Sequence, residues 1–265
     1  MGDTELLALA RDVALEAAAL VRQRRTQEVE VADTKSSPVD VVTEADRASE
    51  ELVYARLTAA RPDDGFLGEE GASAASSSGV TWVVDPIDGT VNFLYGIPQY
   101  AVSIAASRDG VTVAGVVANV ATGEVYTATL GGGAFVDDRP LRVRDAVPLD
   151  QRLVATGFNY VAEVRQMQAL AVGRMLGTVR DIRRLGSAAL DLCALAQGRV
   201  DAYVEEGLAP WDLAAGELIA REAGARVEAR PGAGGTQCVV AAPAAGFDEF
   251  ESLAHRCGFF AGNGE

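Results

Sequence analysis

The segment at residues 82–93 constrains this chain most, because an apolar run ends there in two closely spaced carboxylates. The run at 80–84 predicts a buried strand, and Asp85 and Asp88 follow it with a proline between them. An acidic group at the end of an apolar strand is costly unless it is paired or bound to a metal, and no lysine or arginine lies near these two in the sequence. A glycine and a threonine come next, and the glycine permits close approach of the backbone to a bound group. The segment therefore predicts a site for a hard cation with a phosphate beside it.

The charge balance fits a phosphate site only if cations are bound there. The 265 residues include 23 lysines and arginines against 38 aspartates and glutamates, which gives a net charge of −15. No basic stripe is visible, so binding to a nucleic-acid backbone is disfavoured. A negative surface also keeps proteins soluble, which accounts for part of the acidity. A phosphorylated substrate that approaches so acidic a chain would still need bound cations to admit it.

The cysteines and the apolar runs indicate a cytoplasmic protein without a membrane partner. Cys193, Cys238 and Cys257 are odd in number and lack paired spacing, which favours buried reduced thiols over disulfides or a zinc site. No basic-then-apolar signal segment opens the chain, and no apolar run reaches the roughly 20 residues of a spanning helix. We therefore expect a cytoplasmic location.

The first part of the chain predicts two helices followed by an antiparallel sheet. Apolar residues at helical spacing predict a helix over 4–25, and a second helix should follow Thr43 as its N-cap. The stretch 71–79, rich in glycine, alanine and serine, is interpreted as a flexible surface loop without chemistry. Asp109-Gly110 predicts a tight hairpin turn. The strands expected in this sheet are 100–107, 111–120, 123–130 and 133–136.

A composition shift near Val147-Pro148 divides the chain into two expected halves. Beyond it, strand-like and helical runs alternate, which indicates α/β layering. The expected strands are 152–156, 179–182, 200–204, 225–228 and 237–241, and the expected helices are 161–176, 187–197, 213–223 and 247–255. The prediction is an α+β protein with an antiparallel, sheet-rich half at 1–147 and an α/β half at 148–265, packed together as one functional unit.

Three further acidic clusters have ordinary structural interpretations when each is considered alone. Glu69 and Glu70 lie in a glycine-flanked turn and suit a solvated acidic turn. Asp212 precedes an alanine-rich helix start, for which N-capping is a sufficient account. Thr43 and Asp46 look like a capping box with Asp in place of the usual Glu. Only the acidic pair after the apolar strand is convincing by itself.

The combination of these clusters is more specific than any one of them. Metal-assisted phosphoryl transfer needs carboxylates that hold cations about 4 Å apart, and a hydroxyl or acid that orients the attacking water. It also needs backbone N–H groups for the phosphate oxygens, ideally where a helix starts. The candidates for the carboxylates are Asp85, Asp88, Glu69 and Asp212, and those for the amides and the hydroxyl are Gly89 and Thr90.

Several stretches match the signatures of one known family. Residues 85–93, Asp-Pro-Ile-Asp-Gly-Thr-Val-Asn-Phe, match its first signature at every defining position, and 211–216 followed by 222–225 match its second. Residues 35–40 match its mobile-loop segment, and further matches fall in the right order, at Thr43, Asp46, 68–70 and 184–189. With these matches, which cover essentially residues 5–255, the chain resembles the inositol monophosphatase family. The resemblance implies an alternating αβαβα sandwich, usually assembled as a homodimer, and many members are inhibited by Li⁺.

The resemblance also implies a site for two to three Mg²⁺ ions. The first ion would be held by Glu69, Asp85 and the Ile87 carbonyl, the second by Asp85, Asp88 and Asp212, and a weaker third by Glu69 and water. Because the site would be assembled from oxygen ligands, it suits a hard cation.

Further roles follow from the same resemblance. Thr90 paired with Asp46 would orient the attacking water, beside Glu69, and a capping position for Asp46 is compatible with this role. The phosphate would be bound by the amides of Gly89 and Thr90, and the alcohol portion of the substrate would face Ala188, Glu205, Asp88 and Asp212, with Lys35 on the mobile loop near the metals.

The implied reaction is the Mg²⁺-dependent hydrolysis of a small phosphate monoester, with myo-inositol 1-phosphate as the preferred substrate and no covalent intermediate. Related branches act on fructose 1,6-bisphosphate, histidinol phosphate or adenosine 3′,5′-bisphosphate. Glu205 and Glu206 favour a neutral polyol, because a second phosphate would call for Lys or Arg between 200 and 220 and none is present there. A non-catalytic or regulatory protein on the same fold would be expected to have lost a metal ligand, whereas all are retained.

Three basic residues outside these motifs receive structural interpretations. Arg183 and Arg184 could face a phosphate, but a solvated pair at a strand end or a dimer contact is the favoured interpretation. His255 is expected on the surface of the last helix and not as a ligand.

Overall fold

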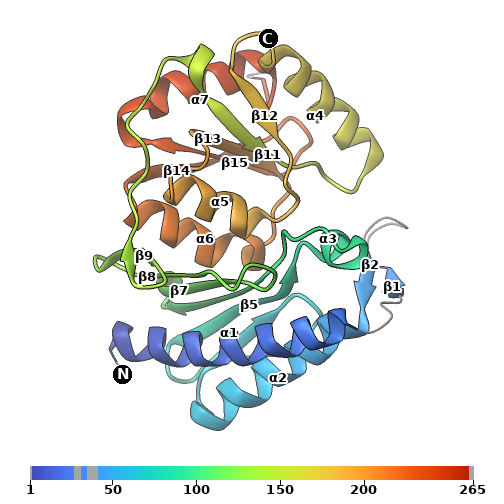
Figure 1. Ribbon diagram of the computed structural model, residues 1–265, viewed down its shortest axis with the longest axis vertical. Coiled ribbons are helices and arrows are strands. Elements are labelled where there is room, and N and C mark those ends of the chain that lie inside the picture. Colours follow the sequence, from blue (N-terminus) through green and yellow to red (C-terminus); the bar gives the residue numbers. More distant parts are fainter. Residues whose placement is uncertain (1, 27–30, 35–40, 263–265) are drawn as a thin grey trace.

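The computed structural model describes residues 2–26, 31–34 and 41–262, and its elements stack in alternating layers of helix and sheet (Figure 1). Two helices form one outer layer, an eight-stranded sheet the second, two helices the middle layer, a five-stranded sheet the fourth and two more helices the last. The expected α+β class and the αβαβα sandwich are therefore confirmed.

The first outer layer consists of α1 (Asp3–Arg25) and α2 (Glu44–Ala60), which pack together and against the eight-stranded sheet. Both helices confirm the sequence prediction, and Thr43 is the N-cap of α2. Beside them, β1 (Val31–Thr34) pairs with β2 (Val41–Thr43). The buried positions of α1 recur every three or four residues and form one apolar stripe, which includes Leu6, Ala10, Val13, Ala17 and Val21.

The eight-stranded sheet has the order β10-β9-β8-β7-β6-β5-β3-β4. Its strands are β3 (Gly65–Gly68), β4 (Ser73–Ala74), β5 (Val80–Asp88), β6 (Ala101–Arg108), β7 (Val111–Asn119), β8 (Val125–Thr129), β9 (Gly133–Val136) and β10 (Arg139–Pro140). Neighbouring strands are antiparallel except β3 and β5, which are parallel. The predicted hairpin between β6 and β7 is confirmed, because Asp109 and Gly110 have φ angles of 50° and 83°, as a type I′ turn requires.

Part of the stretch 71–79 is ordered into this sheet, so the prediction of a loop without regular structure was wrong there. β4 pairs with β3, and the amides of Ser77 and Ser78 donate hydrogen bonds to the carbonyl of Asp63. The Ser78 hydroxyl also donates to the buried carboxylate of Asp64 at 2.6 Å. Besides Ala72 and Ala74, which pack against the core, polar contacts hold this segment, and its sequence shows no strong hydrophobic pattern.

The five-stranded sheet has the order β12-β11-β13-β15-β14. Its strands are β11 (Leu153–Thr156), β12 (Asp181–Arg183), β13 (Ala202–Glu206), β14 (Ala225–Pro231) and β15 (Gln237–Pro243). β11 is parallel to both β12 and β13, whereas β15 is antiparallel to β13 and β14. The parallel strands carry the α/β connections that the alternating sequence pattern predicts.

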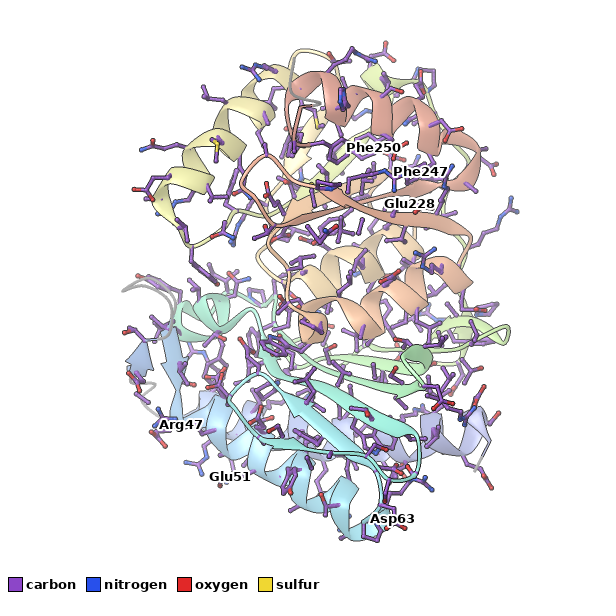
Figure 2. The ribbon with its side chains drawn as sticks, turned by 180° about the vertical axis from the view of Figure 1, so that it is seen from behind. Arg47, Glu51, Asp63, Glu228, Phe247 and Phe250 are labelled. Atoms are coloured by element: carbon purple, nitrogen blue, oxygen red, sulfur yellow. The ribbon has the colours of Figure 1, made fainter. Side chains whose placement is uncertain are left out.

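Helices cover both faces of this second sheet. α5 (Ala188–Ala196) and α6 (Pro210–Glu222) lie between the two sheets, and α4 (Ala162–Met175) and α7 (Phe247–Cys257) form the last layer (Figure 1). Phe247 and Phe250 of α7 are fully buried in the core that α7 shares with this sheet (Figure 2). The remaining short elements are α3 (Thr90–Tyr95) and the two 3₁₀ turns Leu149–Gln151 and Ala244–Gly246.

Several element boundaries differ from the prediction. α6 begins at Pro210, three residues before its expected start, because proline is favoured at the first helical position. β12 and β13 each begin two residues later than expected, and β5 continues through both of its acidic residues. The two sheets use residues 65–140 and 153–243 respectively. The boundary at 147/148 stays a prediction.

Two further observations concern the membrane and the thiols. Within residues 2–26, 31–34 and 41–262, the helices are too short or too polar to cross a bilayer. Cys193, Cys238 and Cys257 are all buried and free of disulfides, as the sequence predicts.

Candidate active site

A cavity of about 290 Å³ lies where the two sheets approach each other around the middle helices. It is lined by the end of β5, the start of α3, the turn after β3, the loop before α5, the end of β13 and the first turn of α6. This volume is close to the lower limit of about 300 Å³ for small-molecule pockets. The cavity therefore suits a ligand of the size of a phosphorylated monosaccharide.

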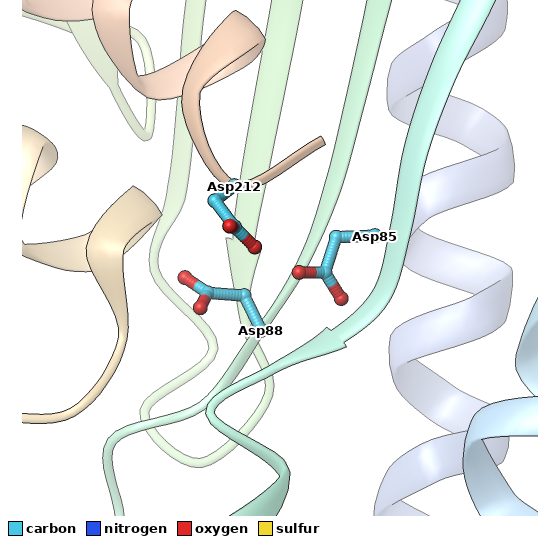
Figure 3. A group of neighbouring side chains, drawn as sticks. All are labelled: Asp85, Asp88 and Asp212. Carbon is cyan, nitrogen blue, oxygen red and sulfur yellow. The ribbon is translucent and has the colours of Figure 1, made fainter. Parts of the chain in front are cut away.

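Three aspartates converge in this cavity. Each of Asp85, Asp88 and Asp212 offers a carboxylate oxygen that lies within 4.8 Å of those of the other two. Figure 3 shows Asp85 and Asp88 approaching from the end of β5, and Asp212 from the start of α6 on the opposite side. The tertiary structure thus brings together residues that are more than a hundred positions apart in the sequence. An all-carboxylate group of this kind has the oxygen ligands that a hard divalent cation requires.

Asp85 is the most strongly confined member of the group, with 1% of its surface exposed. Its carboxylate accepts a hydrogen bond from the Ile87 amide at 3.0 Å. Burial raises the pKa of Asp85 well above its usual range, and the negative charges of Glu69, Asp88 and Asp212 raise it further. Glu69 lies in the turn after β3 and lines the same cavity, beside the group of three.

Asp88 is held from across the cavity by the start of α5. Its carboxylate accepts hydrogen bonds from the Ser187 hydroxyl at 2.5 Å, the Ala189 amide at 2.8 Å and the Ala188 amide at 3.3 Å. Burial raises the pKa of Asp88 to about 6, while these hydrogen bonds favour its charged form. Donors at a helix N-terminus also stabilise a negative charge. One ligand candidate from the first sheet is therefore fixed by a helix of the middle layer.

Asp46 and Asp212 occupy the same position in two different helices. Each is the third residue of its helix, and its carboxylate accepts a hydrogen bond from the N-cap amide, at 2.8 Å from Thr43 and 2.7 Å from Ala209. The capping box at Asp46 is confirmed, but the interpretation of Asp212 as an N-cap was wrong because α6 begins earlier. In both helices the cap fixes a carboxylate. Asp212 lines the cavity itself, whereas the buried Asp46 contacts Thr90, which lines it.

Thr90 connects the Asp46 cap to the end of β5. Its hydroxyl lies 3.1 Å from Oδ1 of Asp46 and 3.1 Å from the Ile87 carbonyl, and its single proton can be donated to only one of them at a time. Burial raises the pKa of Asp46 to about 7, although the Thr43 hydroxyl and amide favour its charged form. The pairing of Thr90 with Asp46 expected from the sequence is present in the structure.

Gly89 adopts a backbone conformation that other residues rarely adopt, with φ of 96°. A Cβ atom there would lie 2.8 Å from the Gln99 carbonyl and 3.1 Å from the Gly186 carbonyl. Only glycine therefore allows the chain to pass from β5 into α3 at this point. The turn directs the backbone of Gly89 and Thr90 along the wall of the cavity.

Glu205, at the end of β13, lines the cavity on the side of the five-stranded sheet. Its carboxylate accepts a hydrogen bond from the buried Tyr203 hydroxyl at 2.8 Å and lies against Gly157, where any side chain would collide with it. Burial raises the pKa of Glu205 to about 7, although the Tyr203 hydrogen bond and the charge of Arg184 favour the ionised form. Ala188 lines the cavity as well.

The sequence pattern of the Inositol monophosphatase family matches residues 3–251. The chain belongs to the inositol monophosphatase family. An inositol-1-monophosphatase of Mycobacterium bovis is 49% identical over 260 residues, which cover 91% of this chain and 90% of the relative. A protein of Pasteurella multocida named Nus factor SuhB is 43% identical over 196 residues, 73% of each chain. With relatives this similar, the chain is a phosphatase of the inositol monophosphatase family.

Solved structures of this family share the fold. Mycobacterium tuberculosis SuhB has a TM-score of 0.84 at 45% identity, covering 97% of this phosphatase and 98% of that chain. An IMPase of Thermotoga maritima has a TM-score of 0.86 at 29% identity, covering 96% and 98%. The layered architecture is thus that of the inositol monophosphatase family.

Two predicted site residues of the phosphatase need separate comment. Glu206 lines the cavity, but its carboxylate also accepts hydrogen bonds from the amides of Gly234 and Thr236 and holds that loop. The expectation that both Glu205 and Glu206 lie beside the substrate stays a prediction. Lys35 lies outside the described residues.

Sequence reasoning missed several residues that shape the site of this family member. Ser187 binds Asp88 and caps α5, and the signals for it were its position at a helix start and its place in the matched stretch 184–189. Glu50 accepts hydrogen bonds from the Glu70 and Ala72 amides and fixes the turn that carries Glu69. A buried acid in the middle of α2 interrupts its apolar stripe, and that interruption was the available signal.

The two arginines that the sequence places side by side differ in the phosphatase. Arg183 is exposed and forms an ion pair with Asp181 at 2.6 Å, which fits a solvated strand end. Arg184 is exposed as well, but it also lines the cavity, which the interpretation as a solvated pair did not include. The alternative of a dimer contact stays a prediction. Apart from the family match at 184–189, which begins at Arg184, nothing in the sequence pattern distinguished the two arginines.

Proposed function

We propose that the protein is a Mg²⁺-dependent phosphatase that hydrolyses myo-inositol 1-phosphate, or a closely related polyol monophosphate, to the free alcohol and phosphate. The observation that carries the proposal is the convergence of Asp85, Asp88 and Asp212 within 4.8 Å in a cavity of about 290 Å³. Their raised pKa values indicate that the group is poorly compensated by protein charges. A bound cation would supply that compensation.

The residues present fit Mg²⁺. Glu69, Asp85 and the Ile87 carbonyl would hold one ion, Asp85, Asp88 and Asp212 a second, and Glu69 with water a weaker third. When bound, Mg²⁺ would lower the pKa of a water molecule and neutralise charge on the phosphate. If the Ile87 carbonyl serves a cation, the Thr90 proton is left for Asp46.

The chain itself would then supply the proton acceptor and orient the reactants. Thr90 would hold the attacking water in line with the bond to the alcohol and pass its proton towards Asp46. Burial of Asp46, which raises its pKa to about 7, suits it to accept that proton near neutral pH. The new P–O bond forms as the bond to the alcohol breaks, and the departing oxygen takes up a proton from solvent.

Two sets of groups would bind the rest of the substrate. The amides of Gly89 and Thr90 would bind phosphate oxygens, as backbone N–H groups at the start of a helix can do. Ala188, Glu205, Asp88 and Asp212 would face the alcohol portion. Glu205 accepts hydrogen bonds and is suited to sugar-like hydroxyls.

The proposal also covers the assembly, inhibition and location of the protein. We propose that it forms a homodimer. Large exposed apolar side chains at the end of α3 support this, with Tyr95 at 74% and Ile97 at 48% exposure. Light scattering coupled to gel filtration would measure the mass in solution. We also include inhibition by Li⁺ and a cytoplasmic location, the latter supported by three free buried thiols.

Purified protein tests the central proposal by phosphate release from myo-inositol 1-phosphate with Mg²⁺ and with EDTA. We expect release only with Mg²⁺, and its loss by at least about 1000-fold in Asp85→Asn, because the shared carboxylate would be removed from both ion sites. Asp63→Asn is the matched control, since Asp63 is exposed in the turn after α2 (Figure 2) and is not among the residues that line the cavity. Full activity in Asp85→Asn would overturn the metal assignment.

A panel of fructose 1,6-bisphosphate, histidinol phosphate and adenosine 3′,5′-bisphosphate then tests the substrate. A higher kcat/KM on any of these would replace inositol phosphate as the substrate while retaining the reaction. No release from any ester would favour a regulatory role on the same fold.

A further inference from the structure

Arg184 occupies an unusual position in an acidic cavity. It follows β12 directly and lines the cavity, and among the described lining residues it is the one lysine or arginine. The acidic residues of the same lining are Glu69, Asp85, Asp88, Glu205, Glu206 and Asp212. A basic residue placed among these acids has a role that neither the metal nor the attacking water explains.

The loop that carries Arg184 is anchored on both sides. The Asn92 side chain donates a hydrogen bond to the Leu185 carbonyl at 2.7 Å. Ser187, two residues further on, binds Asp88 at 2.5 Å. Gly186 has φ of 89°, and a Cβ atom there would lie 2.5 Å from a terminal nitrogen of Arg184. The guanidinium is therefore folded back over Gly186, on a loop fixed to the metal end of the cavity.

Arg184 and Glu205 act on each other across the cavity without direct pairing. Arg184 and Glu205 both line the cavity, and the charge of Arg184 lowers the pKa of Glu205 against the larger effect of burial. Within the described residues, no ion pair within 4.0 Å joins them, and the Glu205 carboxylate bonds to the Tyr203 hydroxyl instead. Because both side chains line the cavity, a ligand bound there can meet a donor and an acceptor that are not paired with each other.

We propose that Arg184 and Glu205 form a donor–acceptor clamp for two neighbouring hydroxyl groups of the substrate alcohol, which makes Arg184 a specificity-determining residue for polyol phosphates. This inference rests on the proposed phosphatase function. A guanidinium only donates hydrogen bonds and an ionised carboxylate only accepts them, whereas each hydroxyl can do both. A vicinal diol therefore satisfies both groups at once.

The same arrangement disfavours a second phosphate on the substrate. Arg184 would attract the additional anion, but Glu205 at the same end of the cavity would repel it, so the pair gives little net gain. The sequence argument from the absence of lysine and arginine between 200 and 220 did not include Arg184, which another loop supplies. On the present proposal Glu205 balances the charge of Arg184, so the expectation of a neutral polyol is unchanged.

The test compares Arg184→Gln with the wild type on three esters. Myo-inositol 1-phosphate carries vicinal hydroxyls, 4-nitrophenyl phosphate carries none, and fructose 1,6-bisphosphate carries a second anion. We expect the KM for inositol phosphate to rise about 10-fold, because one charge-assisted hydrogen bond to the substrate is lost. The kcat should change less than twofold. Kinetics on 4-nitrophenyl phosphate should change far less, and Arg184→Lys should recover part of the loss. Arg183→Gln is the matched control and should alter neither KM, since Arg183 bonds Asp181 on the surface.

Several results would overturn the clamp. Equal losses on inositol phosphate and 4-nitrophenyl phosphate would place Arg184 on the phosphate, and a selective loss on fructose 1,6-bisphosphate would make it an anion site. Unchanged KM values would remove it from the substrate altogether. In the double variant with Glu205→Gln, the clamp predicts a combined loss well below the product of the single losses. Mg²⁺-dependent hydrolysis of 4-nitrophenyl phosphate by the wild type tests the proposed function separately, so the two failures remain distinguishable.

Discussion

The two ends of the cavity are built on opposite electrostatic principles. The acid end, defined by Glu69, Asp85, Asp88 and Asp212, gathers charges of one sign, and burial raises the pKa of each of the three aspartates. The alcohol end, defined by Arg184 and Glu205, has one charge of each sign. On the proposed function, the acid end would bind a cation whatever the substrate, whereas the alcohol end would bind hydroxyls. Reaction and specificity would then be separated in space within one cavity.

The largest effect is expected for a substitution of Asp46, which tests whether the acid end acts independently of the alcohol end. Asp46→Asn should lower kcat by about 100-fold or more, because a general base typically contributes 10²–10⁴-fold. The loss should be equal on inositol phosphate and 4-nitrophenyl phosphate, unlike that of Arg184→Gln, since Asp46 acts on the water and not on the alcohol. Steady-state kinetics on both esters measure this. A loss confined to inositol phosphate would break the division between the ends.

A smaller effect is expected from Ser187→Ala, which removes a support of the acid end. Asp88 loses the hydroxyl donor at 2.5 Å, so half-saturation by Mg²⁺ should shift upward by about 10-fold, as is usual for a group behind a metal ligand. The lost N-cap of α5 should also cost about 1 kcal/mol of unfolding free energy. Titration of the activity with Mg²⁺ measures the shift in half-saturation, and thermal unfolding measures the loss of stability. Ser187→Thr keeps the hydroxyl and should recover the Mg²⁺ response. If Ser187→Ala loses stability without any change in its Mg²⁺ response, Ser187 only caps the helix.

The smallest effect concerns pH and the metal-free protein. In the unfolded chain the carboxyls of Asp46 and Asp88 titrate near 3.8, whereas burial raises their folded pKa values to about 7 and about 6. The folded state therefore binds protons more tightly, and this stabilising contribution is lost as pH rises from about 4 to 7. In EDTA the Tm should fall by several degrees between pH 5 and 7.5, at about 2–4 °C per kcal/mol.

Mg²⁺ should offset this loss, because it replaces the protons as the compensating charge of the acid end. The gain in Tm on adding Mg²⁺ should accordingly be larger at pH 7.5 than at pH 5. Differential scanning calorimetry at the two pH values measures it. An equal gain at both values would contradict the account of the acid end.

The sequence by itself determined the local parts of this protein. The apolar run before Asp85, the Asp109-Gly110 turn and the capping pattern at Asp46 each depend on neighbouring residues, and each is found as predicted. Such patterns suffice because strand periodicity, turn conformation and helix caps are set within a few residues. They fixed the fold class and, with the family signatures, most of the acid end.

Only the tertiary structure decided how distant segments meet. It placed the start of α5 on Asp88, where Ser187 lies 99 positions away, and the third residue of α6 opposite β5. It also placed the Glu206 carboxylate against the loop that carries Gly234, placed Arg184 at the cavity and left Arg183 paired with Asp181 on the surface. These outcomes depend on how the two sheets pack around the middle helices. Arg183 and Arg184 are both exposed, and their local sequence does not say which of them lines a cavity formed by distant segments.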